Sequence, residues 1–126
     1  LITSGSSYLL KLLIERPRPS EAFVTESGDF GGFSFPSGHV LGAVLLWGFG
    51  FYAAPHVLRN RSLRIGTQAV AALVIVLTGL QRVYAGAHWP SDVVGGYLWG
   101  LLFLAIVIWA YELAERRRGS DLTPAI

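Results

Sequence analysis

Three long apolar stretches dominate the hydrophobic pattern of the chain, at residues 40–58, 65–80 and 93–111. Only Pro55 and His56 interrupt the first stretch, and the third contains no charged residue. Each is close to the roughly 20 residues that cross about 30 Å of hydrocarbon at about 1.5 Å per residue. A buried helix of a soluble bundle normally keeps a polar stripe, which the third stretch lacks. The pattern therefore predicts an all-α fold, a transmembrane helix bundle with three membrane-spanning helices.

A further helix is expected at the start of the chain, where residues 2–14 form its end and include Lys11. The chain begins at Leu1, contains no methionine, and lacks the basic segment, apolar stretch and cleavage site of a signal peptide. We therefore expect the later part of a larger membrane domain whose first helices precede Leu1. On this interpretation residues 1–118 belong to an N-terminally incomplete transmembrane domain, and residues 119–126 form a C-terminal tail.

The composition supports a membrane protein and excludes some chemistry. Hydrophobic residues make up 52% of the 126 residues and the mean hydropathy is +0.50, which is high for a soluble domain. The absence of cysteine from the sequence excludes disulfides, thiolate nucleophiles and cysteine metal sites. The arginine run 116–118 follows an apolar stretch, so we interpret it as a topology signal and expect no nucleic-acid partner.

The net charge of +2 hides a segregation of arginines along the chain. Three arginines lie between the first and second apolar stretches, and three follow the third. Because the chain crosses the membrane twice between these clusters, both lie on one face, which the positive-inside rule makes cytoplasmic. The opposite face then receives residues 15–39 and 82–92. The six arginines are Arg59, Arg61, Arg64, Arg116, Arg117 and Arg118.

Polar residues from three separate segments are expected to meet at that opposite face. They comprise three cations, a serine and a glycine at a predicted helix start, two histidines and a carboxylate. Backbone N–H groups at a helix start bind anions, and Lys and Arg supply charge and donors to phosphate oxygens. Three cations can offset a phosphate dianion, so the set predicts a phosphate site without a metal ion or other cofactor. Its members are Lys11, Arg18, Ser37, Gly38, His39, Arg82, His88 and Asp92.

The two histidines of this set differ in their neighbours. Pro90 disfavours helix at the residue before it, which places His88 in a turn and Asp92 at the start of the third apolar helix. A carboxylate hydrogen-bonded to one ring nitrogen fixes the tautomer and leaves the other nitrogen free for nucleophilic attack. His39 has no carboxylate close to it in the sequence, which makes it the better candidate for a general acid.

Three motifs contain these residues. The first is Lys11, six further residues and then Arg18; the second is PSGH at residues 36–39. The third, at residues 82–92, is an arginine, five residues, a histidine, three residues and an aspartate. This series resembles the signature of the type 2 phosphatidic acid phosphatase superfamily, which includes membrane lipid phosphatases and soluble vanadium haloperoxidases.

The resemblance implies a six-helix membrane phosphatase, of which this chain supplies the later part. It implies hydrolysis of a lipid phosphate or diphosphate through a phosphohistidine intermediate, with a membrane lipid phosphate as the substrate. His88 would be the nucleophile, His39 the general acid and Asp92 the residue that orients His88. The phosphate-binding residues would be Lys11, Arg18, Ser37, Gly38 and Arg82.

The chain departs from the family pattern at one position and leaves a choice at another. Gln81 stands where the family usually has serine before the arginine of the third motif. The segment ERPRP offers Arg16 as well as Arg18, and the six-residue gap selects Arg18. Three acidic residues that follow are interpreted as a solvated loop and not as metal ligands, because no histidine pair lies near them. They are Glu21, Glu26 and Asp29.

Two other functions fit part of the pattern. A vanadate-dependent haloperoxidase would use the same cations, but the known members are soluble and three apolar spans oppose this interpretation. A non-catalytic membrane module that binds anionic lipids would explain the spans and the cations, but not the pairing of His88 with Asp92. The substrate stays open among phosphatidic acid, phosphatidylglycerol phosphate and polyprenyl diphosphate, since all three present a terminal phosphate.

The arginine distribution predicts that the site opens to the periplasmic or extracellular side of a bacterial plasma membrane. Apart from the expected phosphate ligands, that face keeps one arginine, Arg16, against six on the other. In this cysteine-free chain, an impermeant thiol reagent applied to intact cells should label Ser27→Cys and spare Ser62→Cys. The reverse labelling pattern would show that the site opens to the cytoplasm.

Overall fold

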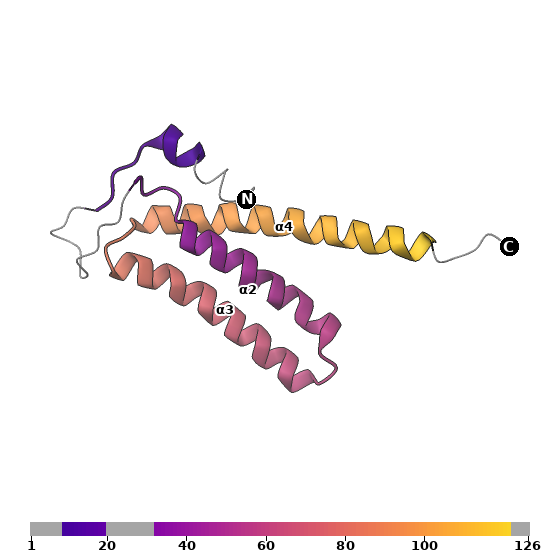
Figure 1. Ribbon diagram of the computed structural model, residues 1–126. Coiled ribbons are helices and arrows are strands. Elements are labelled where there is room, and N and C mark those ends of the chain that lie inside the picture. Colours follow the sequence, from indigo (N-terminus) through magenta and orange to yellow (C-terminus); the bar gives the residue numbers. More distant parts are fainter. Residues whose placement is uncertain (1–8, 20–31, 122–126) are drawn as a thin grey trace.

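The computed structural model of the chain describes residues 9–19 and 32–121. These residues form helices, turns and loops, and no β-strand occurs among them. The predicted all-α fold is therefore confirmed. A short helical segment at residues 9–14 precedes three long helices, which are α2 (Gly38–Val57), α3 (Arg61–Tyr84) and α4 (Pro90–Asp121) (Figure 1).

All three long helices are long and apolar enough to cross a membrane, over Gly38–Val57, Arg61–Tyr84 and Pro90–Arg118. Each overlaps one of the predicted spans, so the three predicted membrane-spanning helices are confirmed. Helix α4 continues to Asp121, and the arginine run 116–118 lies on this helix. Two ion pairs one helical turn apart support its charged end, Arg116 with Glu112 and Arg118 with Glu115, each at 3.7 Å.

Local signals explain where α2 and α3 meet. Asn60 precedes α3, and its side-chain oxygen accepts hydrogen bonds from the backbone N–H groups of Ser62 at 2.9 Å and Leu63 at 3.2 Å. Only residues 58–60 connect the two helices. Such a short connection makes α2 and α3 antiparallel neighbours, as Figure 1 shows.

Helix α2 packs against both α3 and α4, whereas α3 and α4 make few contacts with each other. Glycines on α4 allow the close approach of α2. A Cβ atom built on Gly100 would lie 2.8 Å from Cβ of Val44, and one built on Gly96 would lie 2.9 Å from the backbone oxygen of Ser37. The start of α2 is therefore held against the first turns of α4.

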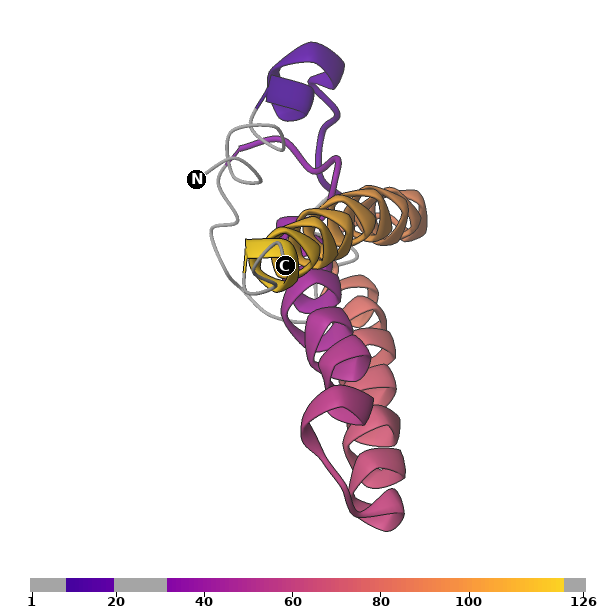
Figure 2. The same cartoon turned by 90° about the vertical axis from the view of Figure 1, so that its right-hand side faces the viewer.

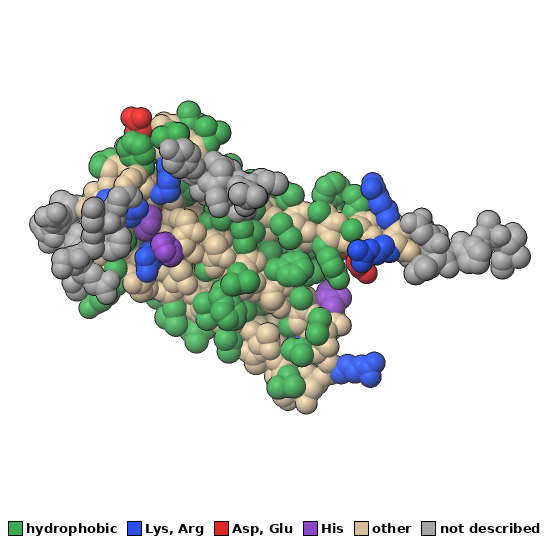
Figure 3. All heavy atoms as spheres, in the orientation of Figure 1, with side chains coloured by type: hydrophobic (Ala, Val, Ile, Leu, Met, Phe, Trp, Pro, Cys, Tyr) green, Lys and Arg blue, Asp and Glu red, His purple; other side chains and the backbone are tan. Residues whose placement is uncertain are grey.

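Much of the helix surface is apolar and exposed within the chain. In α3 the buried residues are Ala71 and Gly79, while Leu73, Leu77 and Leu80 are each at least half exposed. The side chains that cover the visible face of the bundle between its two ends are largely hydrophobic (Figure 3). A surface of this kind suits contact with lipid or with further membrane helices.

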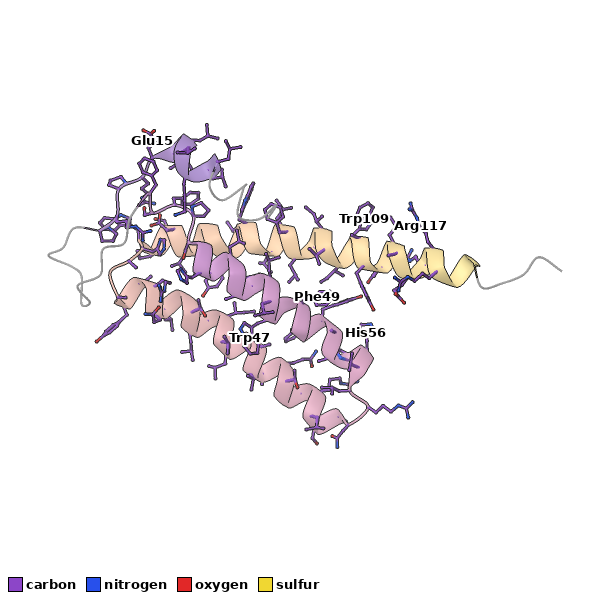
Figure 4. All side chains as sticks on the ribbon, in the orientation of Figure 1. Glu15, Trp47, Phe49, His56, Trp109 and Arg117 are labelled. Carbon is purple, nitrogen blue, oxygen red and sulfur yellow. The ribbon has the colours of Figure 1, made fainter. Side chains whose placement is uncertain are left out.

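The start of α2, the end of α3 and the start of α4 lie together at one end of the bundle (Figure 1). Residues 9–14 lie on the side of α4 away from α3 in both ribbon views (Figure 2). At this end histidine side chains gather beside Lys and Arg side chains (Figure 3). His56 lies near the other end of α2, and Arg117 lies far along α4, whereas Glu15 lies above the end where the histidines gather (Figure 4). Ser27 and the three acidic residues Glu21, Glu26 and Asp29 lie outside the described residues.

We expect Gly96→Ala to destabilise the bundle by about 1–3 kcal/mol, because the added methyl group must displace backbone at the start of α2. The matched control is Gly50→Ala, since a Cβ at Gly50 meets nothing within 4 Å and alanine is the better helix former. Thermal unfolding in detergent, followed by tryptophan fluorescence, measures the difference. Equal unfolding midpoints for the two variants would contradict a tight contact at Gly96.

Candidate active site

A tight turn between α3 and α4 places His88 next to the end of α3. Gly86 adopts a positive φ of 69°, which glycine allows without steric cost, and its N–H donates to the carbonyl of Val83 at 3.0 Å. The backbone N–H of His88 then donates to the carbonyl of Arg82 at 3.2 Å. The five residues between Arg82 and His88 in the third motif therefore form one turn, which holds these two residues at the same end of the bundle.

The start of α4 fixes Asp92. Trp89 precedes the helix and Pro90 is its first residue, a position where proline needs no hydrogen-bond partner. One carboxylate oxygen of Asp92, Oδ2, accepts a hydrogen bond from the backbone N–H of Trp89 at 2.9 Å. At many helix starts the side chain of the third helical residue, here Asp92, accepts a hydrogen bond from the backbone N–H of the residue before the helix, here Trp89. The Asp92 side chain is fully buried.

His88 and Asp92 lie together, as the spacing predicts, but the expected hydrogen bond is not formed. Nδ1 of His88 is 3.7 Å from Oδ2 of Asp92, which is a close electrostatic contact longer than a hydrogen bond. Nδ1 is buried and has no hydrogen-bond partner among the described residues. The carboxylate oxygen instead bonds to the backbone of Trp89, because the helix start supplies that donor at shorter distance.

Burial lowers the pKa of His88 from 6.5 to about 4, and the positive charge of Arg18 acts in the same direction. The charge of Asp92 and a hydrogen bond with the backbone of Ser34 raise the pKa of His88 by less than this. The imidazole is therefore neutral at ordinary pH. A neutral imidazole has one nitrogen without a proton, which is the form that a nucleophile requires.

The N-terminal segment folds over this turn through hydrogen bonds to backbone carbonyls. The Arg18 guanidinium donates to the carbonyl of Ala87 at 2.7 Å and to that of Gly32 at 3.1 Å. The Lys11 ammonium donates to the carbonyl of Phe33. Two of the cations expected to bind phosphate are thus brought to the end of the bundle where His88 lies.

The PSGH turn opens α2 beside the start of α4. The backbone N–H of Ser37 donates to the carbonyl of Asp92 at 3.1 Å, and its hydroxyl is buried without a partner among the described residues. Ser37 makes no side-chain cap to α2. Gly38 is the first helical residue, and both it and His39 are exposed. An orphaned buried hydroxyl and an exposed histidine on one turn are suited to contact with a ligand.

Electrostatic interactions connect the charged members of the predicted set. Three cations act on His39, and Asp92 interacts with Lys11 and Arg18. The guanidinium of Arg82 also donates to the side-chain oxygen of Gln81 at 2.5 Å. Gln81, which stands where the family usually has serine, therefore contacts this arginine. The structure therefore brings together all eight residues of the set. The three cations are Lys11, Arg18 and Arg82.

Sequence reasoning missed Arg16 as a member of this site. Its guanidinium contacts Asp92, with Nη1 3.1 Å from Oδ1, and donates to the hydroxyl of Ser91 at 2.7 Å. The six-residue gap selected Arg18 and left Arg16 without a role. The signal that identifies it is physical, because a carboxylate at a helix start that is flanked by apolar residues needs more than one donor.

The geometry can support transfer of an anionic group. It combines a neutral buried histidine next to a carboxylate, an exposed second histidine, three cations and the start of α2. Cations and helix N–H groups stabilise an anion, and the two histidines lie in different environments, His88 buried and His39 exposed. Within residues 9–19 and 32–121, no group of three or more His, Cys, Asp or Glu residues is arranged to hold a metal ion.

These features define a bundle of membrane-length helices with two histidines, a buried carboxylate and several cations at one end. A family model described as the PAP2 superfamily matches residues 1–116. The chain therefore belongs to the PAP2 superfamily, which confirms the resemblance carried by the three motifs.

Individual relatives agree with this assignment. The chain is 37% identical over 111 residues to phosphatidylglycerophosphatase B of Bacillus subtilis, covering 87% of this chain and 53% of that protein. It is 33% identical over 107 residues to an undecaprenyl-diphosphatase of the same organism, covering 81% of this chain and 46% of that protein. The chain thus spans about half the length of these relatives.

A crystal structure of a transmembrane PAP2-type phosphatidylglycerolphosphate phosphatase from Bacillus subtilis has the same fold. The TM-score is 0.75 at 30% sequence identity, and the match covers 88% of this chain and 54% of that one. Together with the three membrane-length helices, this similarity identifies the chain as an integral membrane protein.

The depressed pKa of His88 predicts a stability that depends on pH. Its folded pKa of about 4 lies below the ordinary value of 6.5, so the unfolded chain binds an extra proton between these pH values. Stability should therefore fall as the pH is lowered through this window, by up to about 3 kcal/mol. His88→Gln should flatten the dependence measured by thermal unfolding in detergent, whereas the exposed His56→Gln should not. An unchanged slope in His88→Gln would contradict burial of a neutral His88.

Proposed function

We propose that the protein is an integral membrane phosphatase that hydrolyses a lipid phosphate or diphosphate through a phosphohistidine at His88. The observation that carries the proposal is the neutral, buried His88 beside Asp92, at the end of the bundle where Lys11, Arg18 and His39 also lie. Membership of the PAP2 superfamily and the phosphatase names of the relatives support the same chemistry.

Substrate binding uses the cations of the site. Lys11, Arg18 and Arg82 attract the phosphate and offset its charge, and the N–H groups at the start of α2 bind a further oxygen. The buried hydroxyl of Ser37 supplies a hydrogen bond that it does not make within the described residues. A lipid can bind in this way with its tail in hydrocarbon, because the site lies at the end of membrane-length helices.

In the first chemical step the unprotonated ring nitrogen of His88 attacks phosphorus. A P–N bond forms as the P–O bond to the leaving group breaks, and His39 gives its proton to the departing oxygen. The cations stabilise the charge that spreads over the phosphoryl oxygens. Asp92 stabilises the positive charge that develops on the ring of His88, which is 3.7 Å away.

In the second step water attacks the phosphorus of the phosphohistidine. His39, now without its proton, accepts a proton from the water as the P–O bond forms and the P–N bond breaks. Inorganic phosphate leaves, and both histidines return to their starting states.

The relatives support a lipid substrate with a terminal phosphate. One is named for phosphatidylglycerophosphate and another for undecaprenyl diphosphate, and both molecules combine a terminal phosphate with long apolar chains. We propose the same class for this protein. Its site faces the periplasmic or extracellular side of a bacterial plasma membrane, as the arginine distribution favours.

Two substitutions test the proposal in the full-length protein. His88→Ala should reduce phosphate release to the uncatalysed background, because it removes the nucleophile. His39→Ala should reduce it by about 10²–10⁴-fold, the usual contribution of a general acid. Release is measured from phosphatidic acid, phosphatidylglycerol phosphate and a polyprenyl diphosphate, and the substrate with the highest kcat/KM identifies the preferred lipid.

The exposed His56, at the other end of α2, provides the matched control, and His56→Ala should keep wild-type turnover. Wild-type turnover in His88→Ala would overturn the proposed mechanism. Binding of these lipids without hydrolysis by the unaltered protein would indicate a non-catalytic lipid-binding module. Vanadate-dependent halide oxidation would indicate a haloperoxidase.

A further inference from the structure

Arg16 makes a direct hydrogen bond and ion pair with Asp92. Its Nη1 lies 3.1 Å from Oδ1 of Asp92, whereas the other carboxylate oxygen bonds to the backbone N–H of Trp89. The Asp92 side chain is 0% exposed and that of Arg16 is 36% exposed. Each oxygen of the buried carboxylate therefore has its own donor, and Arg16 supplies the one that carries charge.

Several other contacts hold Arg16 in place. The same Nη1 atom donates to the hydroxyl of Ser91 at 2.7 Å, and the guanidinium carbon lies 5.8 Å from the centre of the Trp89 ring. The backbone carbonyl of Arg16 accepts a hydrogen bond from the N–H of Ser34 at 2.9 Å. Both the backbone and the head group of Arg16 are thus fixed relative to the start of α4.

Arg16 and Arg18 contact different parts of the site. Arg18 donates to the carbonyls of Gly32 and Ala87 and interacts electrostatically with both histidines. Arg16 donates instead to the side chains of the residues at positions 91 and 92. These hydrogen bonds of the two arginines therefore go to different groups, while the charges of both act on Asp92.

We propose that Arg16 is a positioning residue for the hydrolysis: it orients Asp92 toward His88 and does not bind the substrate. This inference rests on the proposed function, because it assigns a role in the same reaction. The two donors fix the carboxylate plane with Oδ2 turned to both the Trp89 N–H and Nδ1 of His88. Loss of the Arg16 donor frees the carboxylate to rotate about its remaining hydrogen bond.

Charge gives the proposal a second consequence. Arg16 offsets part of the negative charge that Asp92 presents to His88, whose other charged neighbours are Arg18 and Lys11. Without Arg16 the protonated ring of His88 is better stabilised, so the nucleophile is lost to protonation at a higher pH. A residue that only supported folding would lower activity without moving this pH dependence.

The test compares Arg16→Gln, Arg16→Lys and Asp92→Asn in the full-length protein, with Arg59→Gln, an exposed arginine at the other end of the bundle, as the control. Arg16→Gln should lower kcat about tenfold to 100-fold, the usual cost of a misplaced group, and leave KM within about threefold. The acid limb of its kcat/KM profile should move to higher pH. Arg16→Lys should recover most of kcat, because a single nitrogen makes both contacts of Arg16.

A double-mutant cycle isolates the route of the effect. If Arg16 acts through Asp92, the residual turnover of Arg16→Gln/Asp92→Asn should equal that of Asp92→Asn alone. Multiplied losses in the double variant would overturn the proposal, as would a raised KM with unchanged kcat, which marks a phosphate ligand. If Arg16→Gln fails to fold, kcat and the pH profile of Arg16→Lys decide. Wild-type values of both, with the charge retained, support the proposal, and a large loss of kcat contradicts it.

Failure of this inference can be told apart from failure of the proposed function. Wild-type kcat in Arg16→Gln, combined with loss of phosphate release in His88→Ala, would overturn the role of Arg16 alone. Retained release in His88→Ala would overturn the phosphohistidine mechanism itself.

Discussion

A fully buried carboxylate at the end of an apolar bundle is the constraint on which the site depends. A charge without access to water is tolerated only where hydrogen-bond donors and opposite charge surround it. Asp92 meets this requirement with the N–H of Trp89 at its own helix start and the guanidinium of Arg16 from the N-terminal segment. Its backbone carbonyl also accepts the N–H of Ser37, at the start of α2. Satisfying one residue therefore draws all three sequence motifs to the same place.

The helices themselves contribute position and little chemistry. Their central segments are apolar, and the side chains of the candidate site on these helices occur where α2 starts, where α3 ends and where α4 starts. Glycines at the α2–α4 contact bring the first turns of these helices close together, and the turn at Gly86 joins the end of α3 to His88. Packing in the membrane and alignment of the site are thus parts of the same arrangement.

The three long helices could be predicted from the sequence, because hydropathy identifies the membrane spans. The proximity of the three motifs could be predicted as well, because counting the spans shows which helix ends lie on the same face of the membrane. The hydrogen bonds at the site could not. The spacing of His88 and Asp92 places them together, but it does not reveal that the N–H of Trp89 occupies the facing oxygen. The six-residue spacing of the first motif likewise selects Arg18 and not Arg16. The contact of Arg16 follows instead from the burial of Asp92, which the spacing does not reveal. Which of several neighbouring donors bonds to the carboxylate of Asp92 depends on distances in three dimensions, and residue spacing in the sequence does not give these distances.

The exposed surface of α3 bears on how sequences of this kind can diverge. Within the described residues α3 buries little beyond Ala71 and Gly79, and the hydroxyl of Tyr97 reaches the carbonyl of Ile75 in its backbone. Most of its outward positions need only be apolar, so many substitutions among leucine, isoleucine and valine are equivalent there. The glycines of α4 that face α2 have no such freedom, because a Cβ atom would meet the backbone of Ser37 at Gly96 and the side chain of Val44 at Gly100. Substitutions should therefore accumulate on the outward surface of α3 while the α2–α4 contact stays fixed, so that related sequences can differ on this apolar surface and keep the same arrangement of the site.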